Sequence, residues 1–233
     1  MNLIFKALFS PVSAFNDIKR ENKFPGLALV ILLLLIAVNL ILMVPITSKA
    51  TAAMMSTMPI PEAQLDAMLS MTHKLRYLMV IGGVFTMVIM LFIQALIIYI
   101  ITVIAKPAIS YMKVFTLFVY SYFALLIGDF TNTVILYMRG LDKITSPYEL
   151  SFTGLNVLTT LEESGAAIYA LLILINPFYI WFVALLSIGL KVFADIKYTK
   201  AFIISIIFWL IIVIYNVASA VFAEMTMSKA GLM

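Results

Sequence analysis

The sequence predicts an all-α, polytopic membrane protein with five transmembrane helices and an N-terminal interfacial amphipathic helix. Three observations predict this class: 64% of the 233 residues are hydrophobic, only 11% are charged, and the apolar residues gather in long runs. A soluble domain is about 45–50% apolar and about 25% charged. The composition therefore excludes a soluble enzyme and a disordered chain, and the lack of cysteine in the sequence excludes disulfides and thiolate metal sites.

Five stretches are long enough to cross a membrane, which takes about 20 consecutive apolar residues. They lie at about 25–44, 78–105, 114–138, 166–190 and 201–223. We expect two parts in the chain, an interfacial amphipathic segment over 1–23 and a single five-span transmembrane domain over 24–233.

Residues 1–23 have the pattern of an amphipathic helix. Apolar residues recur at helical spacing, namely Ile4, Leu8, Val12, Phe15 and Ile18. Ser10-Pro11 is typical of an N-cap followed by proline at the first helical position, so we expect two short helices. Their apolar face would lie at the headgroup boundary with the basic residues toward anionic lipid, and the alternative is a docking helix for a partner.

The distribution of lysine and arginine predicts the orientation of the spans. With a cytoplasmic N-terminus, most of the 15 basic residues fall in short segments on the cytoplasmic side. The odd number of spans then places the C-terminus outside.

Two sequence signals divide the region before the fourth span. Residues 160–163 (TLEE) form a capping-box pattern that starts a helix. Asn176-Pro177 then breaks or kinks this helix, because proline lacks a backbone donor. We expect an outer, partly immersed helix that bends at Pro177 into the fourth span.

Six polar residues lie inside the predicted spans: Asn39, Gln94, Asp129, Asn132, Asn176 and Asn216. At about 1.5 Å per residue, Asn39, Asp129 and Asn216 each lie about 24 Å from the lysine at the cytoplasmic end of the span. Asn176 lies at a similar depth, Gln94 is closer to the membrane centre, and Asn132 shares the helix face of Asp129. We therefore expect one buried polar layer.

This predicted layer has two interpretations. Interhelical hydrogen bonds that lock the bundle are the favoured one. The alternative is a substrate or proton site around Asp129, because a charged residue at that depth is expensive and usually faces the bundle interior or water.

A weaker signal is a group of methionines near the only histidine: Met54, Met58, Met68, Met71 and His73. Thioethers with an imidazole could bind Cu(I). Methionine also fills gaps in apolar surfaces, which is the favoured interpretation. The sequence has no zinc-protease, nucleophile-elbow or phosphate-loop motif, so we expect no catalytic residue, metal or cofactor.

Two patches of sequence carry a family resemblance. Residues 9–18 (FSPVSAFNDI) resemble the start of prokaryotic members of the Yip family, the Ypt/Rab-interacting proteins with a Yip-one domain. Residues 176–181 (NPFYIW), followed by Leu185, 188–190 (IGL) and 199–202 (TKAF), resemble the family's fourth span, short inner loop and entry into the fifth span.

The resemblance implies a small integral membrane protein of a prokaryotic cell membrane, without known enzymatic chemistry. Eukaryotic members are linked to vesicle traffic, Rab GTPases and membrane shaping, but this sequence lacks their Asp-Leu-Tyr-Gly-Pro motif. Some prokaryotic relatives resemble accessory proteins of export systems, which implies a partner such as an ABC-type exporter.

We therefore predict a non-enzymatic scaffold or accessory protein of the Yip type, active in membrane organisation, trafficking or export. It would act through helix contacts with lipid, with another membrane protein or with a second copy of itself. Nucleic acid is not an expected partner, because the positive charges are scattered over the membrane flanks. The alternative function is a small transporter or permease that uses the polar layer around Asp129.

Overall fold

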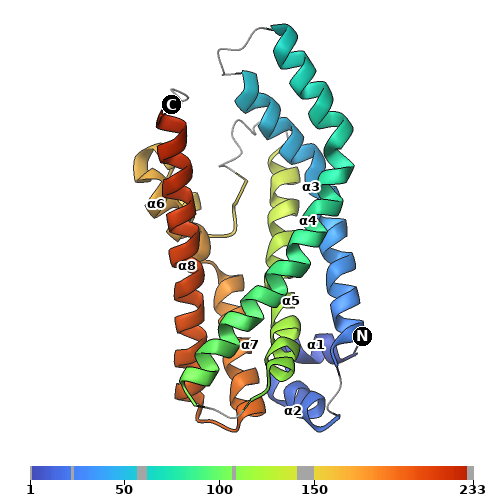
Figure 1. Ribbon diagram of the computed structural model, residues 1–233, viewed down its shortest axis with the longest axis vertical. Coiled ribbons are helices and arrows are strands. Elements are labelled where there is room, and N and C mark those ends of the chain that lie inside the picture. Colours follow the sequence, from blue (N-terminus) through green and yellow to red (C-terminus); the bar gives the residue numbers. More distant parts are fainter. Residues whose placement is uncertain (1, 22–23, 57–61, 107–108, 141–149, 230–233) are drawn as a thin grey trace. The chain divides into compact units, whose positions relative to one another are not determined.

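The computed structural model describes residues 2–21, 24–56, 62–106, 109–140 and 150–229, and these residues form helices and short connections without a strand. Along the chain the helices are α1 (Asn2–Phe9), α2 (Pro11–Glu21), α3 (Gly26–Ser56), α4 (Glu62–Ile104), α5 (Tyr111–Arg139), the 3-10 turn η3 (Leu155–Leu158), α6 (Leu161–Leu174), α7 (Pro177–Ala194) and α8 (Tyr198–Lys229). The α-helices are labelled in Figure 1.

Within the described residues, five helices are long and apolar enough to cross a membrane. These segments are Gly26–Ser56, Lys74–Ile104, Tyr111–Arg139, Pro177–Ala194 and Tyr198–Thr226. The predicted all-α, five-span fold class is therefore confirmed.

Two of the expected span limits differ from the observed helices. Helix α3 does not end near 44 but continues through Pro45 to Ser56, so it is longer than the roughly 20 residues that a span requires. The stretch 166–190 is not one span. It is divided between α6 and α7 at Asn176-Pro177, the break that the sequence predicted.

The described chain forms two compact units. Unit 1 contains Met1–Leu35, Thr86–Gly128 and Pro177–Tyr215, and unit 2 contains Ile36–Phe85, Asp129–Asn176 and Asn216–Met233.

The core of unit 1 is built around the first half of α5, where the side chains from Val114 to Ala124 are buried. The Phe118 ring meets Phe182 of α7 edge-on at 5.7 Å and Phe208 of α8 at 6.1 Å between ring centroids. Edge-to-face aromatic pairs contribute about 0.5–1.5 kcal/mol beyond the area they bury. This aromatic cluster therefore holds α5, α7 and α8 together.

The N-terminal helices α1 and α2 form a hairpin that packs on α7 (Figure 1). Phe15 of α2 is fully buried, with its ring centroid 6.2 Å from that of Phe193. Gly189 allows this approach, because a Cβ there would lie 3.4 Å from the Phe15 ring. We call this pair of helices, Asn2–Glu21, the N-terminal hairpin.

The hairpin confirms the two short helices expected before the first span. Of the predicted apolar face, Ile4, Leu8, Phe15 and Ile18 are buried within the protein. Val12 instead lies on the exposed side, as do Phe5 and Phe9. The face expected at the headgroups is thus covered by the chain's own helices, and a second apolar side remains exposed.

Unit 2 has a smaller core between α3 and α5. Ile46, Ala50 and Leu136 are buried there, and Leu150 and Phe152 pack against them. The segment that follows approaches α6 closely, since the Leu155 amide donates to the Ile175 carbonyl at 3.1 Å.

The predicted capping box at the start of α6 is present. The Thr160 hydroxyl accepts from the Glu163 amide at 3.3 Å, and the Glu163 carboxylate accepts from the Thr160 amide at 3.0 Å. The bond from the Thr160 amide to the carboxylate, with further hydroxyl contacts from Thr160 and Thr159, holds the pKa of Glu163 below its usual value.

Alanine at Gly128 and at Gly82 should have opposite effects on stability. A Cβ at Gly128 would lie 2.7 Å from the Phe178 ring, whereas one at Gly82 would have nothing within 4 Å. We expect Gly128→Ala to destabilise the fold by about 1–3 kcal/mol through overpacking. Gly82→Ala should be neutral or stabilise by up to about 1 kcal/mol. Thermal unfolding in one detergent measures both, and equal melting temperatures would contradict the close approach at Gly128.

Candidate functional site

The predicted polar layer is not gathered in one unit. Five of its residues lie in unit 2, namely Asn39, Asp129, Asn132, Asn176 and Asn216, and Gln94 lies in unit 1. The five residues of unit 2 therefore make up the candidate site.

One hydrogen bond joins α3 to α5 within the predicted layer. The Thr133 hydroxyl is 2.8 Å from Asn39 Oδ1 and 3.0 Å from the Asp129 carbonyl oxygen, and both oxygens can accept its proton. Thr133 is buried and Asn39 is half-buried. A hydrogen bond between two transmembrane helices is worth about 0.6–2 kcal/mol, so this pair can stabilise the α3–α5 contact.

Asn132 fastens a downstream segment to α5. Its side-chain amide donates to the Leu150 carbonyl at 2.7 Å, and its Oδ1 accepts from the Phe152 amide at 2.7 Å. One carboxamide thus satisfies a backbone acceptor and a backbone donor two residues apart. The Arg139 guanidinium lies 3.9 Å from the centroid of the Phe152 ring, which adds a cation–π contact to the same segment.

The other residues of the layer have different surroundings. Asn176 is buried between α6 and α7, and its side-chain amide donates to the Ile173 carbonyl near the end of α6 at 2.9 Å. Asn216 is half-buried, whereas Asp129 is exposed. The sequence analysis expected Asp129 to face the bundle interior or water, and a functional role for this residue remains a prediction.

Sequence reasoning identified Asn132 and missed its partners. The partners are backbone groups of a segment that has no distinctive side chains. Leu150 and Phe152 are apolar, and nothing in their spacing indicates that an amide of α5 would bond the chain between them.

The methionine group is only partly described. Met54 is half-buried, Met68 and Met71 are exposed, and Met58 and the side chain of His73 lie outside the described residues. Among the described residues, no three histidine, aspartate or glutamate side chains are grouped to hold a metal. Copper binding by the methionine group stays a prediction, because Met58 and the His73 side chain lie outside the described residues.

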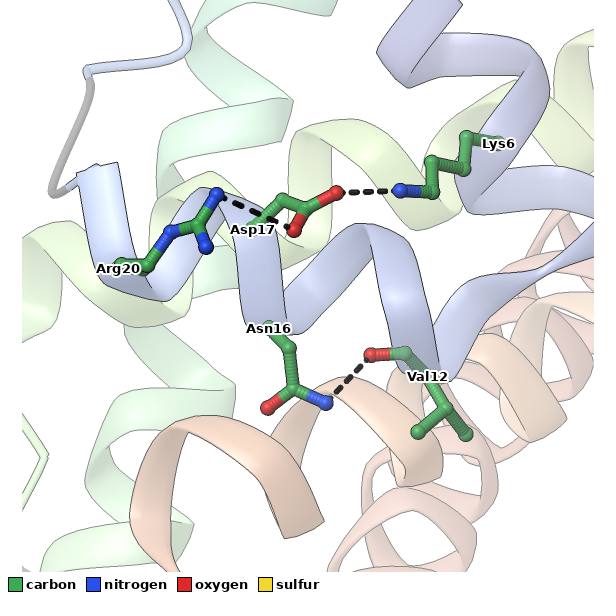
Figure 2. Close-up of polar contacts among 5 residues, drawn as sticks. All are labelled: Lys6, Val12, Asn16, Asp17 and Arg20. Carbon is green, nitrogen blue, oxygen red and sulfur yellow. Dashed lines mark hydrogen bonds and ion pairs between the residues drawn. The ribbon is translucent and has the colours of Figure 1, made fainter.

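The N-terminal hairpin carries a network of charges. Lys6 of α1 donates to the carboxylate of Asp17 on α2, and Arg20 lies 3.8 Å from the other carboxylate oxygen (Figure 2). On the same helix the Asn16 amide donates to the Val12 carbonyl at 2.9 Å (Figure 2). Lys6 lowers the pKa of Asp17, chiefly by hydrogen bonding to its ionised form.

A second contact fastens the hairpin to the end of α7. The Lys19 ammonium donates to the Val192 carbonyl and to the Asp195 carboxylate, both at 2.7 Å. Val192 lies in the last turn of α7, where the backbone carbonyl groups receive no hydrogen bond from an N–H group of the same helix. A cation at that position also interacts favourably with the helix dipole, so Lys19 caps α7 from another helix.

Basic residues outnumber acidic ones in the described part of unit 1. The basic residues are Lys6, Lys19, Arg20, Lys106, Lys113, Lys191, Lys197 and Lys200, and the acidic residues are Asp17, Glu21 and Asp195. A membrane-flanking surface with this balance attracts anionic lipid headgroups.

These features define an α-helical, multi-pass integral membrane protein. The family model described as the Yip1 domain matches residues 5–219, and the chain therefore belongs to the Yip1 domain family. The resemblance seen in the sequence is thus confirmed at the level of the family. No curated protein and no solved structure matches the chain.

Removing the Asn132 carboxamide should release the segment at 150–152 from α5. The chain has no cysteine, so Thr153→Cys supplies a single thiol beside this segment. Asn132→Ala in that background should speed maleimide labelling about tenfold, because each lost hydrogen bond contributes about 0.5–1.5 kcal/mol. Val134→Ala, at an exposed position of the same helix, is the control. Equal labelling rates for the two variants would contradict the anchoring role.

The contact between α1 and α2 should weaken in acid. The folded-state pKa of Asp17 is depressed, so its contribution is present above the ordinary value of 3.8 and is lost as the pH falls below it. Trp181 reports the position of α1, because the Phe9 ring lies 6.0 Å from it. In a Trp209→Phe background, the emission of Trp181 should shift below pH 3.8. Asp17→Asn should abolish that shift, and a shift of equal size in this variant would show that another group causes it.

Proposed function

We propose that this Yip1-domain protein is a non-enzymatic scaffold or accessory protein, which acts within the membrane through helix contacts with another membrane protein and with lipid. The observation that carries the proposal is that the side-chain amides of Asn132 and Asn39 form hydrogen bonds within unit 2. Asn132 bonds the segment at 150–152, and Asn39 accepts from Thr133. These bonds occupy groups that a polar substrate would otherwise contact, which favours a structural role for them.

The surfaces of the spans support the same proposal. We compare the most apolar 18-residue stretch of each helix. In this stretch only 17% of the residues are buried in α3 and 28% in α8, against 72% in α5. Helices that expose this much apolar surface contact lipid or the helices of a partner. The family match fits this role, because the matched residues 5–219 contain most of the five apolar helices.

We further propose that the N-terminus is cytoplasmic and the C-terminus outside, in a prokaryotic cell membrane. Lys106 and Lys113 flank the short connection between α4 and α5, and Lys197 and Lys200 lie at the start of α8. Short basic connections favour the cytoplasmic side. An ABC-type exporter and a second copy of the chain are the candidate partners.

A small transporter is the second candidate function. The observation that favours it is the exposure of Asp129 in the middle of an apolar helix. An ionisable residue inside a span often marks a proton or substrate path.

Photocrosslinking in cells tests the scaffold role. A photoreactive residue at Phe9, which is 71% exposed, or at Phe222, which is 70% exposed, should crosslink to one defined membrane protein or to a second copy of the chain. The same probe at the fully buried Phe15 should crosslink only within the chain. Asp129→Asn should leave the crosslinked yield within about twofold, because the scaffold role does not use this carboxyl.

Two outcomes would contradict the scaffold role. The first is an absence of any protein crosslink at both exposed positions. The second is a loss of cellular activity in Asp129→Asn with unchanged crosslinking, which would favour the transporter.

A further inference from the structure

Unit 1 contains a groove that is lined by the last turns of α4 and the first turns of α8. Its volume is about 460 Å³, within the range of about 300–1,000 Å³ that is usual for ligand sites. The walls are apolar, with Ile101 and Ile104 on α4 and with Ile203, Ile204 and Ile207 on α8. Such walls suit a hydrocarbon chain.

Lys197, Thr199 and Lys200 lie at one end of this groove. The lining itself is almost wholly apolar there too, and both lysines are exposed, so their side chains can carry positive charge at the rim. They lie at the very start of α8, whereas Ile207 lies about 10 Å further along the helix axis from Lys200. Charge is thus confined to the end of the groove where the apolar part of the helix begins.

We propose that this groove binds an anionic phospholipid, with the phosphate at Lys197, Thr199 and Lys200 and one acyl chain along the isoleucines. The two ammonium groups attract the phosphate, and the Thr199 hydroxyl can donate a hydrogen bond to it. The start of α8 adds the positive end of a helix dipole to the same place. Charge complementarity selects an anionic lipid over a zwitterionic one, because the headgroup of the latter carries its own cation.

The order of the groups matches a lipid in its leaflet. In a membrane helix the basic residues lie at the headgroup level and the apolar residues lie deeper. The groove has the same order along α8, from Lys197 and Lys200 to Ile207. This inference deepens the proposed function, on which it rests, by naming a class of lipid.

Native mass spectrometry of the purified full-length chain in a non-ionic detergent tests the site. Phosphatidylglycerol should bind at least about tenfold more tightly than phosphatidylcholine with the same acyl chains. Lys197→Gln/Lys200→Gln should weaken phosphatidylglycerol binding by about fivefold per lysine and leave phosphatidylcholine binding unchanged. Lys74→Gln/Lys191→Gln removes the same charge from exposed positions that do not line the groove, one in each unit, and it should weaken phosphatidylglycerol binding by less than about twofold.

The apolar part of the groove is tested by filling it. Ile104→Trp places a larger side chain in the groove and should weaken binding of both lipids at least about tenfold. Ile180→Trp, at an exposed position of α7, is the matched control and should have no effect. Thermal unfolding of each variant shows whether its fold is kept, and the lysine and tryptophan variants test the site independently.

Three results would overturn the lipid site. They are equal binding of the two lipids, equal loss in the two lysine double variants, and displacement of phosphatidylglycerol by inorganic phosphate at a similar concentration. The last result would assign the lysines to a free anion without a role for the groove. Because the purified chain is used alone, the outcome is separate from whether crosslinking finds a protein partner.

Discussion

Polar groups in the apolar part of this chain have to find partners inside the protein, because hydrocarbon offers them none. The constraint accounts for the helices themselves, in which the backbone satisfies its own hydrogen bonds. It also accounts for Asn132, which meets one free carbonyl and one free amide of the segment at 150–152 with a single side chain. The non-helical segment at 150–152 is stabilised because Asn132 of α5 supplies a hydrogen-bond donor and an acceptor that water would otherwise supply.

Lysine serves three physical roles in unit 1. Lys6 pairs with a carboxylate, Lys19 caps the carbonyl end of a helix from outside, and Lys197 and Lys200 line an apolar groove. The first role joins the two helices of the N-terminal hairpin, and the second fastens the hairpin to α7. In the proposed lipid site, the third role supplies the positive charge that the phosphate of an anionic lipid would meet.

Asp129 is the residue on which the two candidate functions differ. A carboxyl on an apolar helix is costly in hydrocarbon and stable only beside water or a polar partner. A scaffold would cover it with a donor from another protein, whereas a transporter would keep a water path to it. Its neighbours Asn132 and Thr133 already bond within unit 2, so Asp129 is chemically distinct from the rest of the predicted layer.

The sequence by itself determined the fold class and the family, because overall composition and short motifs can be read without a structure. It also determined the break at Pro177 and the capping box at Thr160, because proline chemistry and capping act over a few neighbouring residues. It also identified Asn39 and Asn132 as polar residues inside spans. Only the tertiary structure decided that Asn132 bonds Leu150 and Phe152, that Asp129 is exposed and that Lys197 shares a groove with Ile101. These facts depend on which helix faces lie against each other. In spans that are apolar on nearly every side, the periodicity of apolar residues does not distinguish the face that packs in the protein from the other faces.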